Sequence, residues 1–285
     1  MARRSLLAAL LALVCALLAA APAPVRAEEE TPAGTPQAGD GSAPVNPVGP
    51  PSSEVTVPRG RPLYLEGPDG RLLLDGPWLF RADTSDVGLR ERWFAQTGLD
   101  GWGGTTVPSV WNAGGTSRAS VEGTVAWYRK DFRLPQGRTA RADAWIVRFE
   151  GVNFRATVWL NGRKLGEHVG GHTPFELPLA NVKPRGVNRL VVRVDNRRTL
   201  PPGSAPQPTP PTGWWNYGGI HREVYLRRVD RVDIREVQVA SALPNPRGAA
   251  TVTVAATVAN VTRRDQLVTL RGHFGALPLT LGERL

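Results

Sequence analysis

Apolar and polar side chains alternate along several short stretches in the middle of the chain. Trp145, Val147 and Phe149 fall on one face of an extended segment, and charged side chains between and after them fall on the other. The same period of two runs through residues 154–161, 190–195 and 223–227. Alternation of this kind is typical of antiparallel strands that bury one face and leave the other in water.

One turn between strands is written directly in the sequence. The stretch 154–161 carries Trp159 on its polar face and ends at the dipeptide Asn161-Gly162, after which a second strand-like stretch begins at Arg163. Asn-Gly supplies the two positive φ angles of a type I′ turn, so the two stretches should form a hairpin. The nearest approach to a helical pattern is a turn or two at residues 87–94.

The strand-like stretches predict an all-β protein. Residues 63–228 are expected to form one β-sandwich of roughly 165 residues, a usual size for a single domain. Residues 229–285 hold three further predicted strands, at 232–240, 250–260 and 267–274. We interpret these as the start of a second sandwich, with the alternative that they extend the first.

The N-terminal region is expected to lie outside both domains. Residues 1–27 have Arg3 and Arg4 followed by the apolar run from Leu6 to Ala20, which is typical of a cleaved signal peptide. A secreted or periplasmic location follows, and no later stretch is long and apolar enough to predict a membrane span. Residues 28–62 are rich in Pro, Gly and Ser and are expected to form a disordered linker.

The charge and the cysteine count change this picture little. The formal net charge is +10, but the arginines are spread singly along the predicted strands, so we expect a solvated surface and no nucleic-acid partner. The one cysteine, Cys15, lies in the predicted signal peptide. Without disulfides, a domain of this size must be held by its apolar core.

Seven motifs in order resemble a known family. They are 74–78 (LDGPW), 107–112 (VPSVWN), 127–132 (WYRKDF), 149–152 (FEGV), 158–162 (VWLNG), 170–176 (GGHTPFE) and 216–224 (NYGGIHREV). This order is similar to the N-terminal, sugar-binding jelly-roll domain of glycoside hydrolase family 2, and the last motif most resembles that of β-glucuronidases. The resemblance implies a galactose-binding-like jelly roll, followed by an immunoglobulin-like domain of which 229–285 is the start.

The resemblance also implies where catalysis takes place. Family members hydrolyse β-glycosides with two glutamates, one of them in an Asn-Glu dipeptide, on a (β/α)8 barrel that follows the immunoglobulin-like domain. The 285 residues contain no Asn-Glu dipeptide, so we expect no catalytic residue here. The strand-associated acids are expected to be solvated or salt-bridged; they are Glu122, Glu150, Glu167, Glu176 and Asp195.

Candidate carbohydrate-binding residues cluster after a proline-rich stretch. Trp214, Trp215 and Asn216 combine aromatic rings, which stack on a sugar, with an amide, which binds hydroxyls. Two adjacent tryptophans on an extended strand point to opposite faces, so at most one of them is in the core. The other either stacks on a sugar or packs against the missing barrel. The resembled family has a carboxylate near the sugar just before this aromatic pair, where this chain has Gly213, so the resemblance leaves glucuronate specificity open.

A fourth candidate, Asn112, follows Trp111 at the end of a predicted strand. It either binds a sugar hydroxyl or caps its own turn, and the second reading is favoured. Other motif residues are interpreted as structural: Asn161, Gly162, His172, Gly219 and Arg222. The four histidines are scattered, so no metal site and no cofactor are expected.

Three functions remain in play from the sequence. The first is the accessory, sugar-binding region of a secreted retaining β-glycosidase, whose partners are a β-glycoside, the missing catalytic barrel and, as a further option, a second copy of the chain. The second is a freestanding, non-catalytic carbohydrate-binding module. The third is a structural domain without a sugar site. The identity of the sugar stays open.

Overall fold

The computed structural model describes residues 15–18, 55–60, 71–113, 115, 120, 122–136, 144–197, 215–244, 249–262 and 264–284. Strands dominate these residues, in agreement with the predicted all-β class. The chain divides into two compact units, one of residues 35–228 and one of residues 1–34 together with 229–285. The proposed linker lies outside the described residues except for 55–60, and so does the proposed leader except for 15–18.

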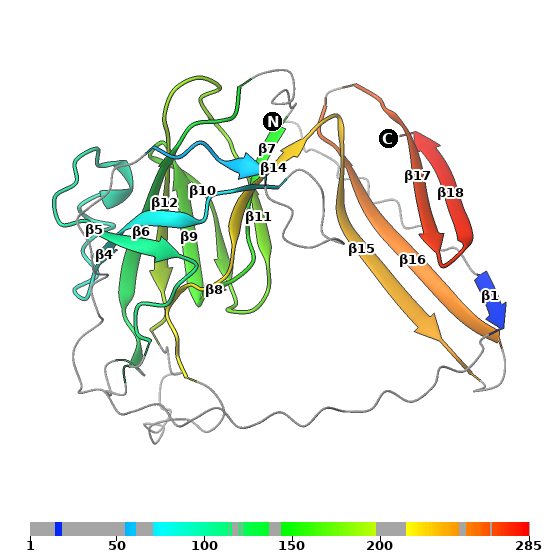
Figure 1. Cartoon of the computed structure of the whole chain (residues 1–285), viewed down its shortest axis with the longest axis horizontal. Coiled ribbons are helices and arrows are strands. Elements are labelled where there is room, and N and C mark those ends of the chain that lie inside the picture. The colour runs from blue at the N-terminus through cyan, green and yellow to red at the C-terminus, as the bar shows by residue number, and fades with distance from the viewer. Residues whose placement is uncertain are drawn as a thin grey trace. The chain divides into compact units, whose positions relative to one another are not determined.

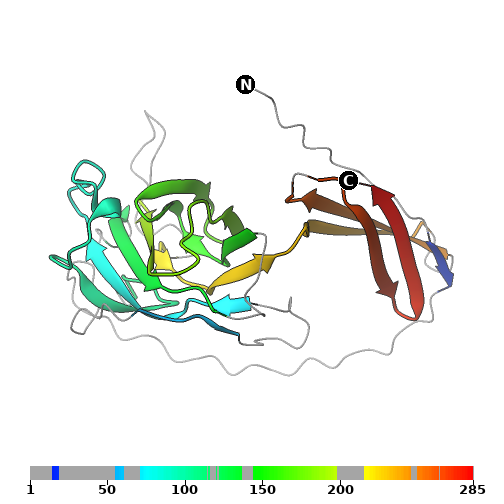
Figure 2. The ribbon, with the colours of Figure 1, turned by 90° about the horizontal axis from the view of Figure 1, so that it is seen from above.

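The first unit contains two large sheets (Figures 1 and 2). The six-stranded sheet has the order β10 (Arg163–Val169), β9 (Arg155–Leu160), β12 (Asn188–Asp195), β6 (Val125–Phe132), β4 (Gly76–Ala82) and β5 (Gly103–Val107). The five-stranded sheet has the order β11 (Phe175–Pro178), β7 (Ala144–Phe149), β14 (Val224–Val229), β3 (Arg71–Leu73) and β2 (Arg59–Gly60). A short pair, β8 (Val152–Asn153) with β13 (Gly219–Ile220), completes the unit.

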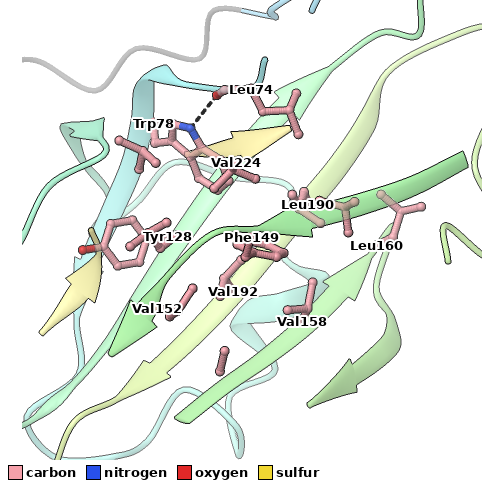
Figure 3. Close-up of a cluster of buried hydrophobic side chains, with 14 of the residues drawn as sticks. Leu74, Trp78, Tyr128, Phe149, Val152, Val158, Leu160, Leu190, Val192 and Val224 are labelled. Atoms are coloured by element: carbon pink, nitrogen blue, oxygen red, sulfur yellow. Dashed lines mark hydrogen bonds between the residues drawn. The ribbon is translucent and has the colours of Figure 1, made fainter. Parts of the chain in front are cut away.

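The main core draws its side chains from both sheets, which makes the unit a sandwich. Figure 3 shows Trp78, Tyr128, Leu160 and Leu190 of the six-stranded sheet in the same cluster as Phe149 and Val224 of the other sheet. The indole N–H of Trp78 donates to the Leu74 carbonyl at 2.8 Å, which satisfies the one polar atom of this large ring. The apolar sets predicted by alternation on β7, β9, β12 and β14 belong to this core, so that prediction is confirmed.

The predicted hairpin is confirmed as well. Asn161 and Gly162 have φ angles of 50° and 79°, and β9 pairs with β10 directly across them, Leu160 opposite Arg163. The Asn161 side chain also accepts a hydrogen bond from the Arg189 backbone N–H at 3.0 Å, which joins the turn to β12. The turn therefore fixes the register at this edge of the sheet.

The expectation that the outer faces are exposed to water is wrong for the six-stranded sheet. A second cluster covers that face, in which Trp93 and Trp102 of the 83–102 segment pack on Leu79, Val125, Trp127, Trp159 and Val191. Trp159 stacks between Trp127 and Phe94, with ring centroids 5.3 and 5.1 Å away. The central strands are thus buried on both faces, because a segment with no strand of its own packs over them.

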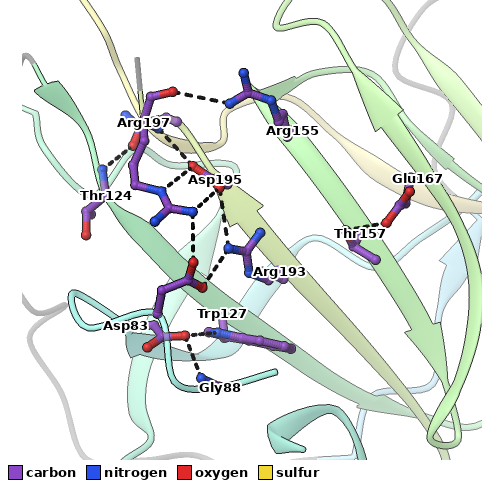
Figure 4. Close-up of polar contacts among 12 residues, drawn as sticks. Asp83, Gly88, Thr124, Trp127, Arg155, Thr157, Glu167, Arg193, Asp195 and Arg197 are labelled. Atoms are coloured by element: carbon purple, nitrogen blue, oxygen red, sulfur yellow. Dashed lines mark hydrogen bonds and ion pairs between the residues drawn. The ribbon is translucent and has the colours of Figure 1, made fainter. Parts of the chain in front are cut away.

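Asp83 anchors the start of this covering segment (Figure 4). Its carboxylate accepts hydrogen bonds from the backbone N–H of Val87 and Gly88 at 2.8 and 2.9 Å, and from the Trp127 indole at 2.8 Å. One i to i−4 backbone bond, from Glu91 to Val87, follows. The helical turn expected at 87–94 is thus present in part, and it ends in the 3₁₀ helix η1 (Trp93–Ala95).

Asp131 ties the far end of the covering segment to the sheet. Arg129 and Arg189 both approach its carboxylate with two nitrogens, at 2.8–3.1 Å. The same guanidinium groups donate to backbone carbonyls of residues 96–98. Burial alone would raise the pKa of Asp131, but the hydrogen bonds from these arginines lower it below its ordinary value.

The strand-associated acids are solvated or paired, as predicted. Glu150 bonds Arg148 at 2.7 Å, Glu176 bonds Arg227 at 2.7 Å, and Glu167 bonds Lys164 at 2.6 Å. Asp195 pairs with Arg197 at 2.7 Å and with Arg193 at 3.4 Å, on the outer face of β12 (Figure 4). Glu122 is exposed.

The second unit consists of long antiparallel pairs (Figure 1). These are β15 (Val232–Ala242) with β16 (Ala249–Asn260), and β17 (Leu267–Phe274) with β18 (Leu277–Arg284); β1 (Cys15–Leu18) also pairs with β16. The three predicted strands are confirmed. The fourth, β18, was not predicted, because Pro278 and Gly282 are unfavourable in strands, although Leu277, Leu279 and Leu281 alternate with them.

The described part of the chain contains no helix with the length and hydropathy needed to cross a membrane.

Candidate functional site

The segment 215–218 leads into β13 and lies where several loops of the sandwich meet. Backbone bonds join it to the segment after β5: the Trp111 N–H donates to the Gly218 carbonyl at 3.0 Å, and the Ser109 N–H donates to Ile220 at 2.9 Å. Two of the predicted sugar-binding residues, Trp215 and Asn216, lie in this segment, and Trp214 lies outside the described residues. The remaining candidate, Asn112, lies directly beside it.

Asn112 is buried, with 4% of its surface exposed, and its side chain is fully engaged. Its Nδ2 donates to the Asn216 carbonyl at 2.9 Å and to the Ser120 carbonyl and hydroxyl at 3.2 and 3.0 Å. Its Oδ1 accepts from the Gly218 N–H at 2.9 Å. Two of these bonds run to Asn216 and Gly218, 104 and 106 positions away. The favoured reading, a cap of its own turn, needs a bond from the backbone N–H two residues on, at Gly114, which lies outside the described residues.

Asn216 is also turned inward. Its Nδ2 donates to the Asn196 carbonyl at 2.9 Å, and the Asn196 Nδ2 donates back to the Asn216 carbonyl at 3.0 Å. The Asn196 Oδ1 accepts from the Thr124 N–H at 2.8 Å, so the pair is fastened to the strand β6 side of the sandwich. Asn216 is only 5% exposed, so its side chain joins the segment to the body of the sandwich and does not face solvent.

Asn153 of β8 completes the set of buried amides. Its Nδ2 donates to the Asn216 Oδ1 at 3.3 Å and to the Tyr217 carbonyl at 2.5 Å. Its Oδ1 faces Gly171, where an added Cβ would lie 2.6 Å away. Gly171, within the motif 170–176, thus leaves room for this amide.

Two glycines allow the backbone to pass close to the core. An added Cβ at Gly218 would lie 2.1 Å from the Trp111 ring. Gly219 has a φ of 142°, and its Cβ would lie 2.6 Å from the Ser109 carbonyl oxygen and 3.0 Å from the Tyr128 hydroxyl. Burial raises the pKa of Tyr128, so its hydroxyl stays protonated.

Aromatic side chains form the accessible part of the segment. Tyr217 is 45% exposed although both its neighbours in the chain are buried. Trp215 is half-buried, and its indole N–H points to the Ser120 hydroxyl at 3.5 Å. A bond from the Tyr217 N–H to the Trp215 carbonyl at 2.9 Å closes a three-residue turn between them.

The histidines and Arg222 lie at the other end of β13. His172 is exposed, and its ring centroid lies 6.0 Å from that of His221, whose buried ring nitrogens have no hydrogen-bond partner within the described part of the chain. Burial and the nearby charge of Arg222 lower the pKa of His221. Arg222 is exposed and, among the described residues, has no ion-pair partner, but its Cδ lies 3.0 Å from where a Cβ at Gly151 would be.

The site is suited to holding a polar ligand through stacking and hydrogen bonds. Within the described residues, no three His, Cys, Asp or Glu side chains are grouped to hold a metal ion. The acids of the strands are engaged in ion pairs on the outer faces. An exposed aromatic ring on a backbone fixed by amides can stack on the apolar face of a ligand. Polar groups of the loops can then bind the hydroxyls of that ligand.

Sequence reasoning placed Asn112, Trp215 and Asn216 among the candidates. It included Tyr217 only as part of the motif 216–224, and it missed Asn153 and Asn196. Asn153 and Asn196 also bond to the segment 215–218, but Asn153 follows a Gly-Val pair and Asn196 only ends an alternating strand. Neither position has a spacing that indicates a partner, since the contacts join residues 63 and 20 positions apart. Only the position of Asn153 just after motif 149–152 could have singled it out.

The two-layer arrangement, with amides and aromatic rings at the loops between strands, is that of jelly-roll carbohydrate-binding domains. Residues 72–229 match the model described as glycosyl hydrolases family 2, sugar binding domain, and the chain belongs to this family.

Named relatives agree with this assignment. The β-glucuronidase of Rattus norvegicus is 31% identical over 219 residues, 67% of this chain and 34% of the relative. The β-galactosidase of Thermoanaerobacter pseudethanolicus is 34% identical over 119 residues, 40% of this chain and 15% of the relative. The structure of Ruminococcus gnavus β-glucuronidase in complex with D-glucuronic acid is 25% identical, with a TM-score of 0.54 over 72% of this chain and 37% of that one. The chain thus spans about a third of the length of the β-glucuronidases it matches.

Proposed function

We propose that the chain is the sugar-binding region of a secreted β-glycosidase that acts on β-glucuronides, with the catalytic barrel supplied by further polypeptide. Family membership supports a carbohydrate ligand. The β-glucuronidases among the relatives support glucuronides as the substrate class, and the β-galactosidase keeps galactosides as the comparison to be tested. The signal-like residues 1–27 support secretion.

The observation that carries this proposal is the exposed Tyr217 ring on a backbone held by buried amides. A pyranose has an apolar C–H face that stacks on an aromatic ring, and an exposed tyrosine between two buried residues is placed for such stacking. The half-buried Trp215 two residues earlier extends the aromatic surface. The chain's share of the reaction is then to bind and orient the glycoside.

The reaction itself needs groups that the described residues do not bring together. A retaining glycosidase places two carboxylates about 5 to 5.5 Å apart across the scissile bond. In the described sandwich, Glu150, Glu176 and Asp195 are held in ion pairs with arginines. Burial would raise the pKa of Glu150, but its bonds from Arg148 and Tyr225 lower it, so it is poorly suited to act as a proton donor at neutral pH.

Calorimetric titration of the 285-residue chain with methyl β-D-glucuronide and methyl β-D-galactoside tests the proposal. We expect measurable binding of the glucuronide, weaker binding of the galactoside, and a loss of about tenfold in affinity for Tyr217→Ala. Leu89→Ala removes an equally exposed apolar side chain, 46% exposed, and should leave the affinity unchanged. Absence of binding to both glycosides, or equal binding by Tyr217→Ala, would refute the proposal.

A further inference from the structure

Four buried asparagines form one hydrogen-bonded cluster around the segment 215–218. Asn112, Asn153, Asn196 and Asn216 are between 1% and 5% exposed. We propose that this asparagine cluster is a positioning device: it holds the backbone beneath Trp215 and Tyr217 in the conformation that receives the ligand, without touching the ligand. The inference rests on the proposed function, since it assigns how the same site is kept ready for a glycoside.

Side chains hold this backbone where a strand partner would otherwise do so. The Asn216 carbonyl accepts from both Asn112 and Asn196, at 2.9 and 3.0 Å. The Tyr217 carbonyl accepts from Asn153, and the Gly218 N–H donates to Asn112 at 2.9 Å. Three consecutive residues are therefore held by the side-chain amides of three residues from other parts of the chain, Asn112, Asn153 and Asn196.

An amide is the side chain that fits these demands. At Asn112 one nitrogen faces two backbone carbonyls, those of Asn216 and Ser120, while one oxygen faces the Gly218 N–H. A carboxylate would place a second oxygen against the two carbonyls, and an alanine would leave them without this donor. Asparagine alone among small side chains carries a donor and an acceptor on one planar group.

The arrangement of exposure indicates that the cluster acts through the aromatic rings. Asn216 and Gly218 are buried on either side of Tyr217, which is 45% exposed although its carbonyl is bonded. A ring that projects from a fixed backbone loses little conformational freedom when it binds. Among the described residues the Asn153 Oδ1 has no hydrogen-bond partner, so the cluster is not fully satisfied, and its main effect is to fix a single backbone conformation.

The decisive comparison is between Asn112→Ala and Asn188→Ala in the 285-residue chain. Asn188 is completely buried and also bonds backbone groups, the N–H and carbonyl of Lys183 at 2.8 and 3.0 Å, but it does not contact residues 215–218. Both variants should be less stable than the wild type. Only Asn112→Ala should weaken binding of methyl β-D-glucuronide, by about tenfold, when both are measured fully folded.

Hydrogen exchange gives a readout that does not depend on any sugar. In Asn112→Ala the amides of Tyr217 and Gly218 should exchange at least about tenfold faster, and in Asn188→Ala they should keep the wild-type rate. If the wild type binds no glycoside but exchange changes in this way, the proposed function fails while the role of the cluster in fixing this backbone is upheld. Unchanged exchange in Asn112→Ala overturns the positioning proposal.

Asn112→Asp adds a test by pH. At neutral pH its carboxylate faces the carbonyls of Asn216 and Ser120, so glucuronide affinity should fall as in the alanine variant. When the carboxyl group is protonated at lower pH it donates a hydrogen bond again, and affinity relative to the wild type at the same pH should recover in part. An Asp variant that binds as tightly as the wild type at neutral pH would contradict the proposal.

Discussion

The carboxylate of Asp83 accepts a hydrogen bond from the indole N–H of Trp127 at 2.8 Å, across 44 positions of sequence. The same carboxylate receives two backbone N–H groups of the segment that covers the six-stranded sheet. Asp83 therefore joins the six-stranded sheet to the segment 83–102 that covers it.

Replacement of Asp83 should lower the free energy of unfolding. Asp83→Ala leaves three donors without a partner, and we expect a loss of about 3 kcal/mol in the free energy of unfolding, measured by urea denaturation. Asp100→Ala, at an exposed position of the same segment, is the control and should change stability by less than about 0.5 kcal/mol. Equal effects of the two substitutions would show that the hydrogen bonds of Asp83 contribute nothing specific.

Gly219 should not tolerate a side chain. Its φ of 142° and the 2.6 Å approach of a Cβ to the Ser109 carbonyl combine backbone strain with a clash. Gly186 also has a positive φ, 109°, but an added Cβ there meets no atom within 4 Å. Gly219→Ala should therefore lower the free energy of unfolding by about 2 kcal/mol more than Gly186→Ala does. Thermal unfolding of the two variants measures the difference, and similar melting temperatures would contradict it.

Asp131 should make the free energy of unfolding depend on pH in the acidic range. Its pKa in the folded state lies below the ordinary value, so the unfolded chain binds the proton first as the pH falls. The stabilisation is present above pH 4, the ordinary range of an aspartate, and is lost as the pH falls through the folded pKa. Asp131→Asn should be less stable than the wild type at pH 7, and the gap should narrow towards pH 2. A constant gap in denaturation experiments across this range would argue against the coupling.

His221 is a base, but, like Asp131, it should make the chain less stable as the pH falls. Burial and Arg222 lower its pKa, so the folded chain resists a proton that the unfolded chain accepts near pH 6.5. The free energy of unfolding should then decrease as the pH falls below about 6.5. His221→Gln should flatten the dependence between pH 7 and 5, and Arg222→Gln should weaken it. A slope unchanged by either substitution would sink this prediction.

The sequence predicted the strands well because local signals determine them. Alternation at 145–150 and 190–195 and the Asn161-Gly162 turn each depend on residues a few positions apart. The burial of Trp159 was missed, since it depends on Phe94 and on a covering segment that has no periodicity. Local pattern shows that a strand has two faces, and tertiary packing decides whether both are covered.

In the candidate site, too, local signals predicted some residues and tertiary packing decided the rest. Asn216 and Asn112 were singled out from their residue types, and they do lie together. The inward orientation of Asn112 and Asn216 could not be predicted, because an asparagine in a loop suits a turn, a ligand or a buried amide equally. Asn153 and Asn196 became visible only when the fold brought them to the same backbone.

The covering segment 83–102 has a consequence for how such a domain diversifies. Because it seals the second face of the six-stranded sheet, mutations in the central strands are constrained from two sides at once. Tolerance for sequence change is then confined to the connections that leave the strand ends. Ligand preference can then change through substitutions in these loops while the β-sandwich itself stays the same.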